Sequence, residues 1–203
     1  MIKCSKTNVY NFENALRGMR NPLDSWSMSD SSFEGEVVLG EKDLRLAKQL
    51  RKAGSDHRKY LRQILVSVDI EGPLYWWKEF DTYKVATVAN STSTMHTIHK
   101  KGLVPEMFSV EGISKQTQEV FASYLAYLEG LRLSFNKTKD KKTWEEIIKL
   151  LPSSFNQLRT VTLNYETLMS IYQARKNHKL VEWREFCQWI EKLPYFKEIV
   201  LED

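Results

Sequence analysis

Hydrophobic positions follow a helical period along most of the chain. Apolar residues recur every three or four positions in six segments: 12–19, 41–52, 114–135, 143–151, 160–179 and 180–196. This spacing predicts amphipathic helices, each with one face turned toward a core. Acidic residues begin the segment 41–52, basic residues end it and Gly54 follows, an order typical of a helix of that length.

One segment alternates instead. Residues 61–70 alternate in part, and one side of an extended chain carries Ile64, Val66, Val68 and Ile70, all β-branched. The pattern predicts a strand, ended by Gly72 and Pro73. Pro73 suits the first turn of a helix because its missing N–H costs nothing there. We therefore expect a helix over 74–80 with an inward face of Leu74, Trp77 and Phe80.

Polar stretches connect these elements. Residues 1–39 are expected to hold the first helix and a long polar loop, and residues 90–112 a surface or lining loop. Residues 136–142 carry four Lys and no large apolar side chain, which favours a solvated linker over a nucleic-acid patch. Thr143 and Glu146 have the capping-box spacing and predict the next helix start. The expected class is one helix-rich α+β domain over 1–203.

Composition excludes only a few classes of function. The net charge of the 203 residues is +4, too weak by itself to indicate nucleic-acid binding. Cys4 and Cys187 form no zinc motif, so we expect a reducing cytoplasm and no metal. No stretch approaches the roughly 18 apolar residues of a membrane span. The sequence also lacks a P-loop, G-x-G-x-x-G, G-x-S-x-G and H-E-x-x-H.

Three weaker candidates for chemistry remain. His57 ends a Gly-Ser-Asp-His turn, where it is either a held functional group or an ordinary surface histidine. Residues 81–96 combine Lys84 with six Ser and Thr hydroxyls, which can bind a phosphate or a base edge, or simply cap turns. Residues 175–179, RKNHK, gather three cations at an expected helix end. Arg175 suits a carboxylate, a phosphate or a uracil-like imide.

The order of the segments resembles the flavin-dependent thymidylate synthases, the ThyX or thymidylate-synthase-complementing family. The likeness covers residues 40–190 and is carried by AGSDHRKYLRQILVSVDIEGPLYWWKEFDTYKVATVANSTSTMH and then LPSSFNQLRTVTLNYETLMSIYQARKNHKLVEW. It implies a ThyX-like fold with a small, mainly antiparallel sheet, in a homotetramer that binds FAD and dUMP between subunits. In that family a methylene group passes from methylenetetrahydrofolate to uracil while NADPH reduces the flavin.

The resemblance also implies roles for individual residues. His57, Lys84 and Asn164 are expected at the flavin. Arg175 is expected to hold the uracil of dUMP and to serve in catalysis. Ser93 stands near the active-site serine of the family, and Ser91 and Ser93 are expected at the nucleotide.

Several family positions hold different residues. Thr82, Tyr83 and Lys84 replace Arg-His-Arg, Ser91 replaces a Glu, and Met95 and Glu166 each replace an Arg. Since a charged hydrogen bond is worth roughly 1.5 to 3 kcal/mol, these losses are expected to weaken FAD binding. A carboxylate at 166 is expected to repel a flavin phosphate.

Three functions follow from these observations. The first is a divergent flavin-dependent methyltransferase acting on dUMP. The second is a non-catalytic nucleotide-binding or scaffold member that has lost the flavin site. The third is a nucleic-acid-binding protein that uses residues 137–142 and 175–179 for phosphates and Trp76 and Trp77 for stacking. It ranks last because the charge excess is small and the tryptophans suit a core helix better.

Overall fold

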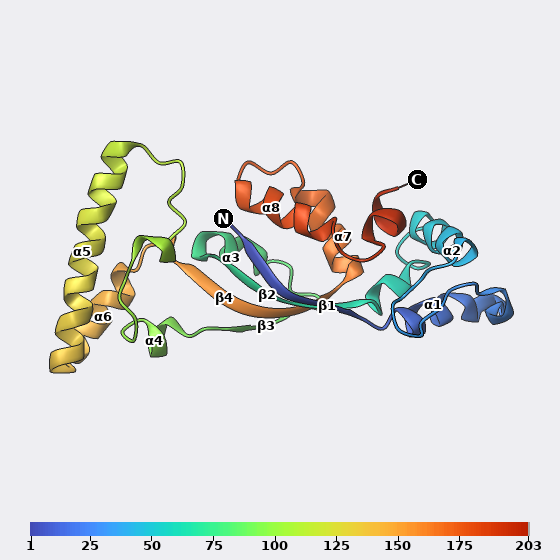
Figure 1. Cartoon of the computed structure of the whole chain (residues 1–203), viewed down its shortest axis with the longest axis horizontal. Coiled ribbons are helices and arrows are strands. Elements are labelled where there is room, and N and C mark those ends of the chain that lie inside the picture. The colour runs from blue at the N-terminus through green and yellow to red at the C-terminus, as the bar shows by residue number, and fades with distance from the viewer. Residues whose placement is uncertain (203) are drawn as a thin grey trace. The chain divides into compact units, whose positions relative to one another are not determined.

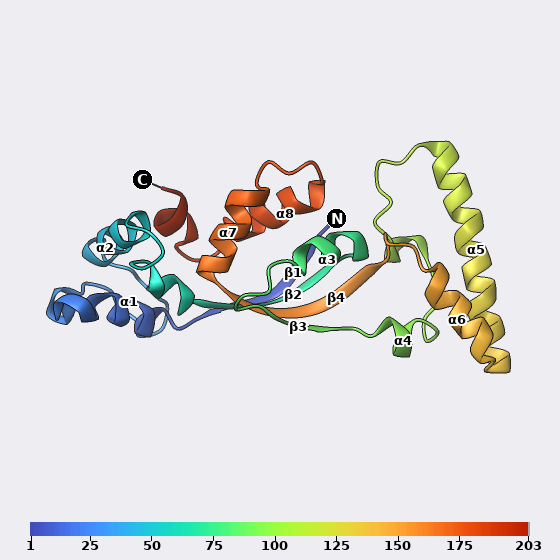
Figure 2. The same ribbon diagram turned by 180° about the vertical axis from the view of Figure 1, so that it is seen from behind.

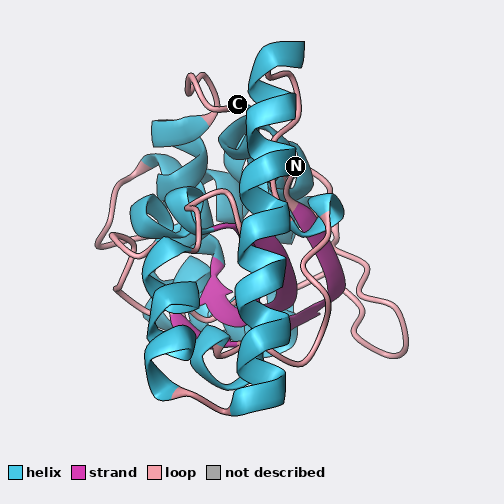
Figure 3. Ribbon diagram, turned by 90° about the vertical axis from the view of Figure 1, so that its left-hand side faces the viewer, coloured by secondary structure: helices cyan, strands magenta, loops and turns pink. Residues whose placement is uncertain are grey.

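The structure, a computed structural model, describes residues 1–202 (Figure 1). Its strands are β1 (Lys3–Tyr10), β2 (Leu65–Pro73), β3 (Val88–Ser91) and β4 (Asn156–Asn164). Its α-helices are α1 (Phe12–Arg20), α2 (Glu41–Lys52), α3 (Leu74–Phe80), α4 (Thr94–Thr97), α5 (Lys115–Thr138), α6 (Lys141–Leu150), α7 (Tyr165–Arg175) and α8 (Val181–Ile190). Helix predominates over strand (Figure 3), which confirms the predicted helix-rich α+β class.

The strands form one sheet in the order β1-β2-β4-β3. Side-chain hydrogen bonds join Ser67 to Thr162 at 3.3 Å and Asp69 to Thr160 at 2.6 Å, so β2 and β4 run antiparallel. The β-branched residues of β2 are buried, as the alternation predicted: Val66, Val68 and Ile70. The strand begins only at Leu65, because Lys59–Arg62 form a 3-10 helix before it.

The contacts divide the chain into two compact units. Unit 1 comprises Met1–Lys3, Ile70–Thr82 and Asn90–Arg159. Unit 2 comprises Cys4–Asp69, Tyr83–Ala89 and the chain from Thr160 onward. The single domain expected from the sequence stays a prediction.

Unit 1 has a core beneath its two long helices. Helices α5 and α6 lie side by side (Figures 1 and 2). Seven buried residues make up this core: Ile98, Leu103, Phe108, Leu125, Leu128, Ile147 and Phe155. In α3, Trp77 and Phe80 are buried as predicted, with ring centroids 5.2 Å apart. Leu74 is only half-buried, and Trp76 is buried although it was not expected on the inward face.

Unit 2 is held by buried aromatic rings and one buried ion pair. The Tyr165 ring lies 5.8 Å from that of Phe12 and 5.3 Å from that of Phe196. Arg20 donates from Nε to Asp43 at 2.6 Å, and both side chains are almost fully buried. This pair anchors the segment between α1 and α2, which carries little periodicity of its own.

Four expectations about local structure were wrong. Residues 3–10 form β1 where only a helix and a loop were expected. Residues 160–164 end β4 and do not begin a helix. Residues 136–142 are mostly exposed as expected, but the linker was too long, because α5 runs to Thr138 and α6 begins at Lys141. Residues 90–112 hold α4 and buried core residues, so they are more than a surface loop.

Candidate functional site

The residues singled out in the sequence fall in both units. His57, Lys84, Asn164 and Arg175 belong to unit 2, whereas residues 91 and 93 belong to unit 1. Each group is described within its own unit.

Arg175 lies at the last turn of α7 against two aromatic side chains. Its Nε donates a hydrogen bond to the hydroxyl of Tyr83 at 2.9 Å. The guanidinium carbon lies 4.7 Å from the ring centroid of Trp183 and 5.7 Å from that of Tyr83. The two rings meet edge to face at 6.0 Å. A planar cation is therefore fixed in place by a hydrogen bond and two ring faces.

Glu166, in the first turn of α7, is clamped by two arginines. Arg58 donates to one carboxylate oxygen at 3.1 Å, and Arg62 donates to both oxygens. Burial opposes ionisation of Glu166, but the hydrogen bonds from Arg62 and Arg58 outweigh it and lower its pKa. The charge expected to repel a phosphate is thus balanced locally, and these three residues together carry a net positive charge.

Asn164 is buried and caps α7. Its side-chain oxygen accepts a hydrogen bond from the backbone N–H of Thr167 at 2.9 Å. The hydroxyl of Thr167 donates to the carbonyl of Val85 at 3.2 Å, which ties residues 83–89 to α7. Lys84 is exposed on this tied segment. Asn164 therefore places Arg175 indirectly, by fixing where α7 begins.

His57 is one of the residues that line a cavity of about 470 Å³ in unit 2. The turn before it is closed by a hydrogen bond from its N–H to the carbonyl of Gly54 at 3.1 Å, with Gly54 at a φ of +106° that suits glycine. The imidazole is exposed. The cavity wall includes Tyr60, whose hydroxyl donates to the carbonyl of Ala47 at 2.8 Å.

Residues 91 and 93 flank an anchored threonine in unit 1. Ser91 is exposed at the end of β3, and Ser93 is half-buried before α4. The hydroxyl of Thr92 donates to the carbonyl of Leu158 at 2.8 Å. The carbonyl of Ser93 accepts from the hydroxyl of Thr97 at 2.7 Å. Both serines are thus held by backbone geometry.

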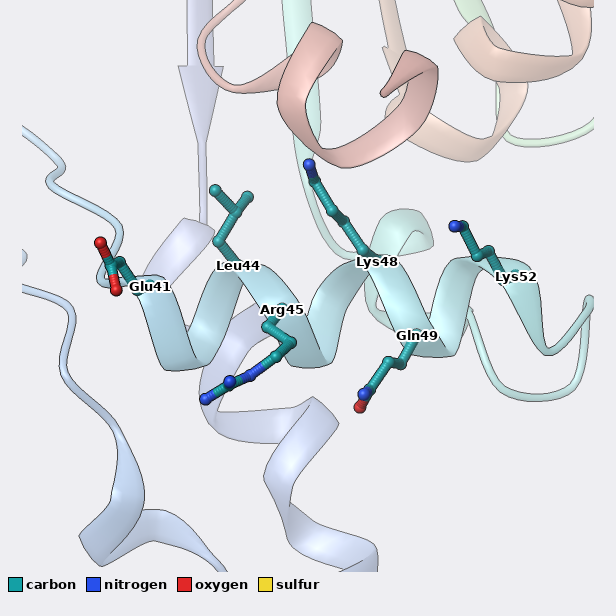
Figure 4. Close-up of a pocket in the computed structure, with 6 residues that line it drawn as sticks. All are labelled: Glu41, Leu44, Arg45, Lys48, Gln49 and Lys52. Atoms are coloured by element: carbon teal, nitrogen blue, oxygen red, sulfur yellow. The ribbon is translucent and has the colours of Figure 1, made fainter. Parts of the chain in front are cut away.

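Two other hollows carry none of the predicted site residues. One, of about 420 Å³, lies along α2 (Figure 4) and is lined by Glu41, Leu44, Arg45, Lys48, Gln49 and Lys52. The other, of about 560 Å³, lies in unit 1 against Phe108 and Phe121. Within residues 1–202, no cluster of three or more His, Cys, Asp or Glu side chains could hold a metal ion. In the same part of the chain, no helix combines the length and apolar character that crossing a membrane requires.

Sequence reasoning missed the partners of the site residues. Neither Trp183 nor the pair Arg58 and Arg62 was singled out, although an Arg at both i and i+4 directly after His57 was a visible signal. Trp76 and Trp77 are 0% and 1% exposed. The stacking role considered for them in nucleic-acid binding was wrong, because no base can reach a buried ring.

Comparisons with known proteins find similarity in structure only. No protein-family model matches the chain, and no curated protein matches it. Its structure superposes on ThyX of Helicobacter pylori with FAD and dUMP at a TM-score of 0.75, covering 100% of this chain and 97% of that one at 18% identity. The chain has the ThyX fold.

Two further solved structures agree with this fold. A second structure of Helicobacter pylori ThyX, also complexed with FAD and dUMP, gives the same TM-score of 0.75 and 18% identity, and covers 100% of this chain and 98% of that chain. The UMP/dUMP methylase PolB from Streptomyces cacaoi, bound with 5-Br dUMP, matches at a TM-score of 0.62 and 13% identity, over 94% of this chain and 88% of that chain. The ThyX-like fold implied by the sequence resemblance is confirmed.

Proposed function

We propose that this chain binds a uracil nucleotide such as dUMP through Arg175 and modifies its ring as a divergent enzyme of the ThyX type. The observation that carries the proposal is Arg175 itself, held between Tyr83 and Trp183 on a helix of a ThyX-like fold. The solved neighbours of that fold contain dUMP or its 5-bromo analogue. Ser91 and Ser93 are proposed at the nucleotide on the sequence resemblance alone.

Arg175 has the chemistry that such a reaction needs. A guanidinium is always charged and donates several coplanar hydrogen bonds, which suits the carbonyl oxygens of an imide. C5 of a uracil ring is most nucleophilic when the ring carries negative charge that is shared with those oxygens. A cation already fixed in position stabilises that charge without reorganising.

FAD fits the described residues poorly. A flavin diphosphate requires cations at its phosphates, and Arg58 and Arg62 are already engaged by Glu166. Lys84 offers a point charge in place of a planar fork. His57 and Asn164 stay predicted flavin contacts, and NADPH and methylenetetrahydrofolate are proposed only if the enzyme is active. No step of the proposal passes through the flavin.

The clamp on Glu166 favours a second candidate, a non-catalytic protein that binds a nucleotide without flavin. In both cases we propose a cytoplasmic homotetramer, as the resemblance implies. The two candidates share the nucleotide and differ in the cofactor, so they can be separated by binding experiments.

The first experiment is calorimetric titration of dUMP into the wild type, Arg175→Ala and the control Lys179→Ala. Both substitutions remove one cation from residues 175–179, but only Arg175 is expected to contact the ring. The proposal requires binding that Arg175→Ala weakens at least roughly tenfold and Lys179→Ala leaves unchanged. Equal affinities in all three proteins, or no binding by the wild type, would overturn it.

The second experiment follows flavin fluorescence as FAD is added with and without dUMP. FAD binding that dUMP strengthens supports the enzyme. If calorimetry shows that dUMP binds and the fluorescence shows that FAD does not, the non-catalytic candidate is supported.

A further inference from the structure

Tyr83 is a partner of Arg175 that lies far from it in sequence. It belongs to residues 83–89 of unit 2, and its hydroxyl accepts the Nε–H of Arg175 at 2.9 Å. The contact joins residues 92 positions apart. By sequence resemblance, Tyr83 stands at the middle position of the Arg-His-Arg signature. Tyr83, which differs from the family signature, thus contacts Arg175, which matches the family.

The contact restricts the guanidinium end of the Arg175 side chain. A free arginine side chain samples many rotamers, and a binding event must otherwise overcome the entropy lost when it is ordered. The Tyr83 hydroxyl fixes Nε, while the rings of Trp183 and Tyr83 lie against the guanidinium. The orientation of the guanidinium plane is thus set in the free protein.

The segment that carries Tyr83 is itself fixed. Thr167 donates to the carbonyl of Val85 at 3.2 Å, and Thr167 lies in the first turn of α7, the helix that carries Arg175 at its other end. Ala86, which follows Val85, has a φ of +55°, an uncommon conformation for a residue with a side chain. Tyr83 and Arg175 are therefore connected both directly and through α7.

We propose that Tyr83 is a positioning residue that sets the affinity for the nucleotide by orienting Arg175. The inference rests on the proposed function, because it assigns Tyr83 a role toward the ligand of Arg175. Trp183 also contacts Arg175, but it is 0% exposed, so its replacement would disturb the core as well. The Tyr83 hydroxyl can be removed alone.

Tyr83→Phe is the informative substitution, with Tyr10→Phe as its control in the same unit. Tyr10 is 50% exposed and ends β1. Removing the hydroxyl leaves the Nε–H of Arg175 without this acceptor. We expect Tyr83→Phe to weaken dUMP binding about tenfold in calorimetry with an unchanged melting temperature. Tyr10→Phe should bind as the wild type does.

Tyr83→His supplies a readout that a merely structural role would not change. A neutral imidazole accepts a hydrogen bond from Arg175, whereas an imidazolium cannot and repels it. Affinity relative to the wild type should therefore be near normal at about pH 8 and fall about tenfold at about pH 5.5, on either side of the ordinary histidine pKa. The ratio is taken at each pH because a nucleotide phosphate itself titrates near pH 6.

A measurement without ligand separates this inference from the proposed function. The Arg175 Nε–H should give a slowly exchanging NMR signal in the wild type that broadens in Tyr83→Phe. Wild-type binding with Tyr83→Phe within twofold of it would overturn the inference and leave the proposed function intact. Failure of the wild type to bind dUMP would overturn the affinity role together with the proposed function, and the NMR signal would then report only whether Tyr83 orders Arg175.

Discussion

Glu166 accepts hydrogen bonds from Arg62 through both of its carboxylate oxygens, and Arg58 adds another at 3.1 Å. The Glu166 side chain is only 14% exposed, so these bonds are poorly screened by water. The cluster connects the 3-10 helix Lys59–Arg62 to the start of α7. By sequence resemblance an Arg is expected at 166. In this chain an Arg at position 166 would lie against the two cations Arg58 and Arg62.

Charge reversal at this position is therefore predicted to destabilise the fold. Glu166→Arg should lower the free energy of unfolding by roughly 2 to 3 kcal/mol, because it removes charged hydrogen bonds and places like charges together. The double variant Arg62→Glu with Glu166→Arg should recover part of that loss. Urea denaturation of the single and double variants measures the coupling.

An exposed ion pair provides the comparison. Glu145 pairs with Lys149 at 3.3 Å on the surface of α6, with the two side chains 40% and 73% exposed. Glu145→Arg should change the free energy of unfolding by less than about 0.5 kcal/mol. Equal effects at 145 and 166 would show that the Glu166 cluster contributes no more than a surface pair.

Asp43 is predicted to be the most sensitive polar residue of unit 2. Its fully buried carboxylate accepts hydrogen bonds from Arg20 and from the hydroxyls of Ser29 and Ser31, each at 2.6 Å. Asparagine has one acceptor oxygen, so Asp43→Asn leaves buried donors unpaired. The expected loss is about 3 to 5 kcal/mol in urea denaturation. Asp24→Asn, at an exposed residue with a φ of +51°, should cost less than about 0.5 kcal/mol.

The same carboxylate predicts how stability depends on acid. Burial opposes ionisation of Asp43, but hydrogen bonds from Ser29, Ser31 and Arg20 outweigh it and lower its pKa. A lowered pKa contributes stability that is present above the unfolded pKa of roughly 3.9 and is lost as the pH falls through the folded value. The wild type should lose stability steeply below about pH 4, and Asp43→Asn less steeply. Parallel acid profiles would contradict this assignment.

The fold could be predicted wherever local pattern and packing agree. Strong periodicity located α2, α5 and α8, and β-branched alternation located β2. The strand β1 escaped because its burial pattern is almost entirely exposed, so no alternation marked it. In β4, Val161 and Leu163 also fit the period of the helix after them. The capping role of Asn164 was overlooked, although asparagine is a typical residue at the start of a helix and its side chain here accepts from Thr167.

The site was predictable only at the level of single residues. Arg175 and Asn164 could be picked out because the order of segments resembles a known family. Their contacts depend on how distant segments pack, and neither the Tyr83 hydroxyl nor the Trp183 ring beside Arg175 leaves a periodic trace in the sequence. The expected repulsion at Glu166 ignored Arg58 and Arg62 for the same reason.

The N-cap of α6 is a different residue from the one expected from the sequence. Thr143 was expected to cap this helix, but Asp140 does so, accepting from the backbone N–H and the hydroxyl of Thr143 at 2.8 Å each. Asp140→Ala should therefore lower the free energy of unfolding, because it removes this cap. Thr143→Ala keeps the backbone donor and should cost less. The reverse order of the two losses in urea denaturation would restore Thr143 as the cap.

The two cysteines are predicted to be unreactive in the folded chain. Burial raises the pKa of Cys4 to about 12, and burial, assisted by Glu191, raises that of Cys187 to about 11. At pH 8 a thiol with a pKa near 11 is only about 0.1% thiolate, against about a quarter for an unfolded thiol near 8.5. Labelling with a disulfide reagent at pH 8 should be at least about 100-fold slower than in urea.

Cys4→Ser assigns the remaining signal to Cys187, which is 3% exposed and so is also shielded sterically. Because both folded pKa values exceed the unfolded one, the stability that these thiols contribute is full below about pH 8.5 and is lost as the pH rises toward the folded values. Unfolding free energy should decline above about pH 9, and less so in the Cys4→Ser variant. Fast labelling of the folded protein at pH 8 would mean that the segments around Cys4 or Cys187 open readily, in conflict with the packing of unit 2.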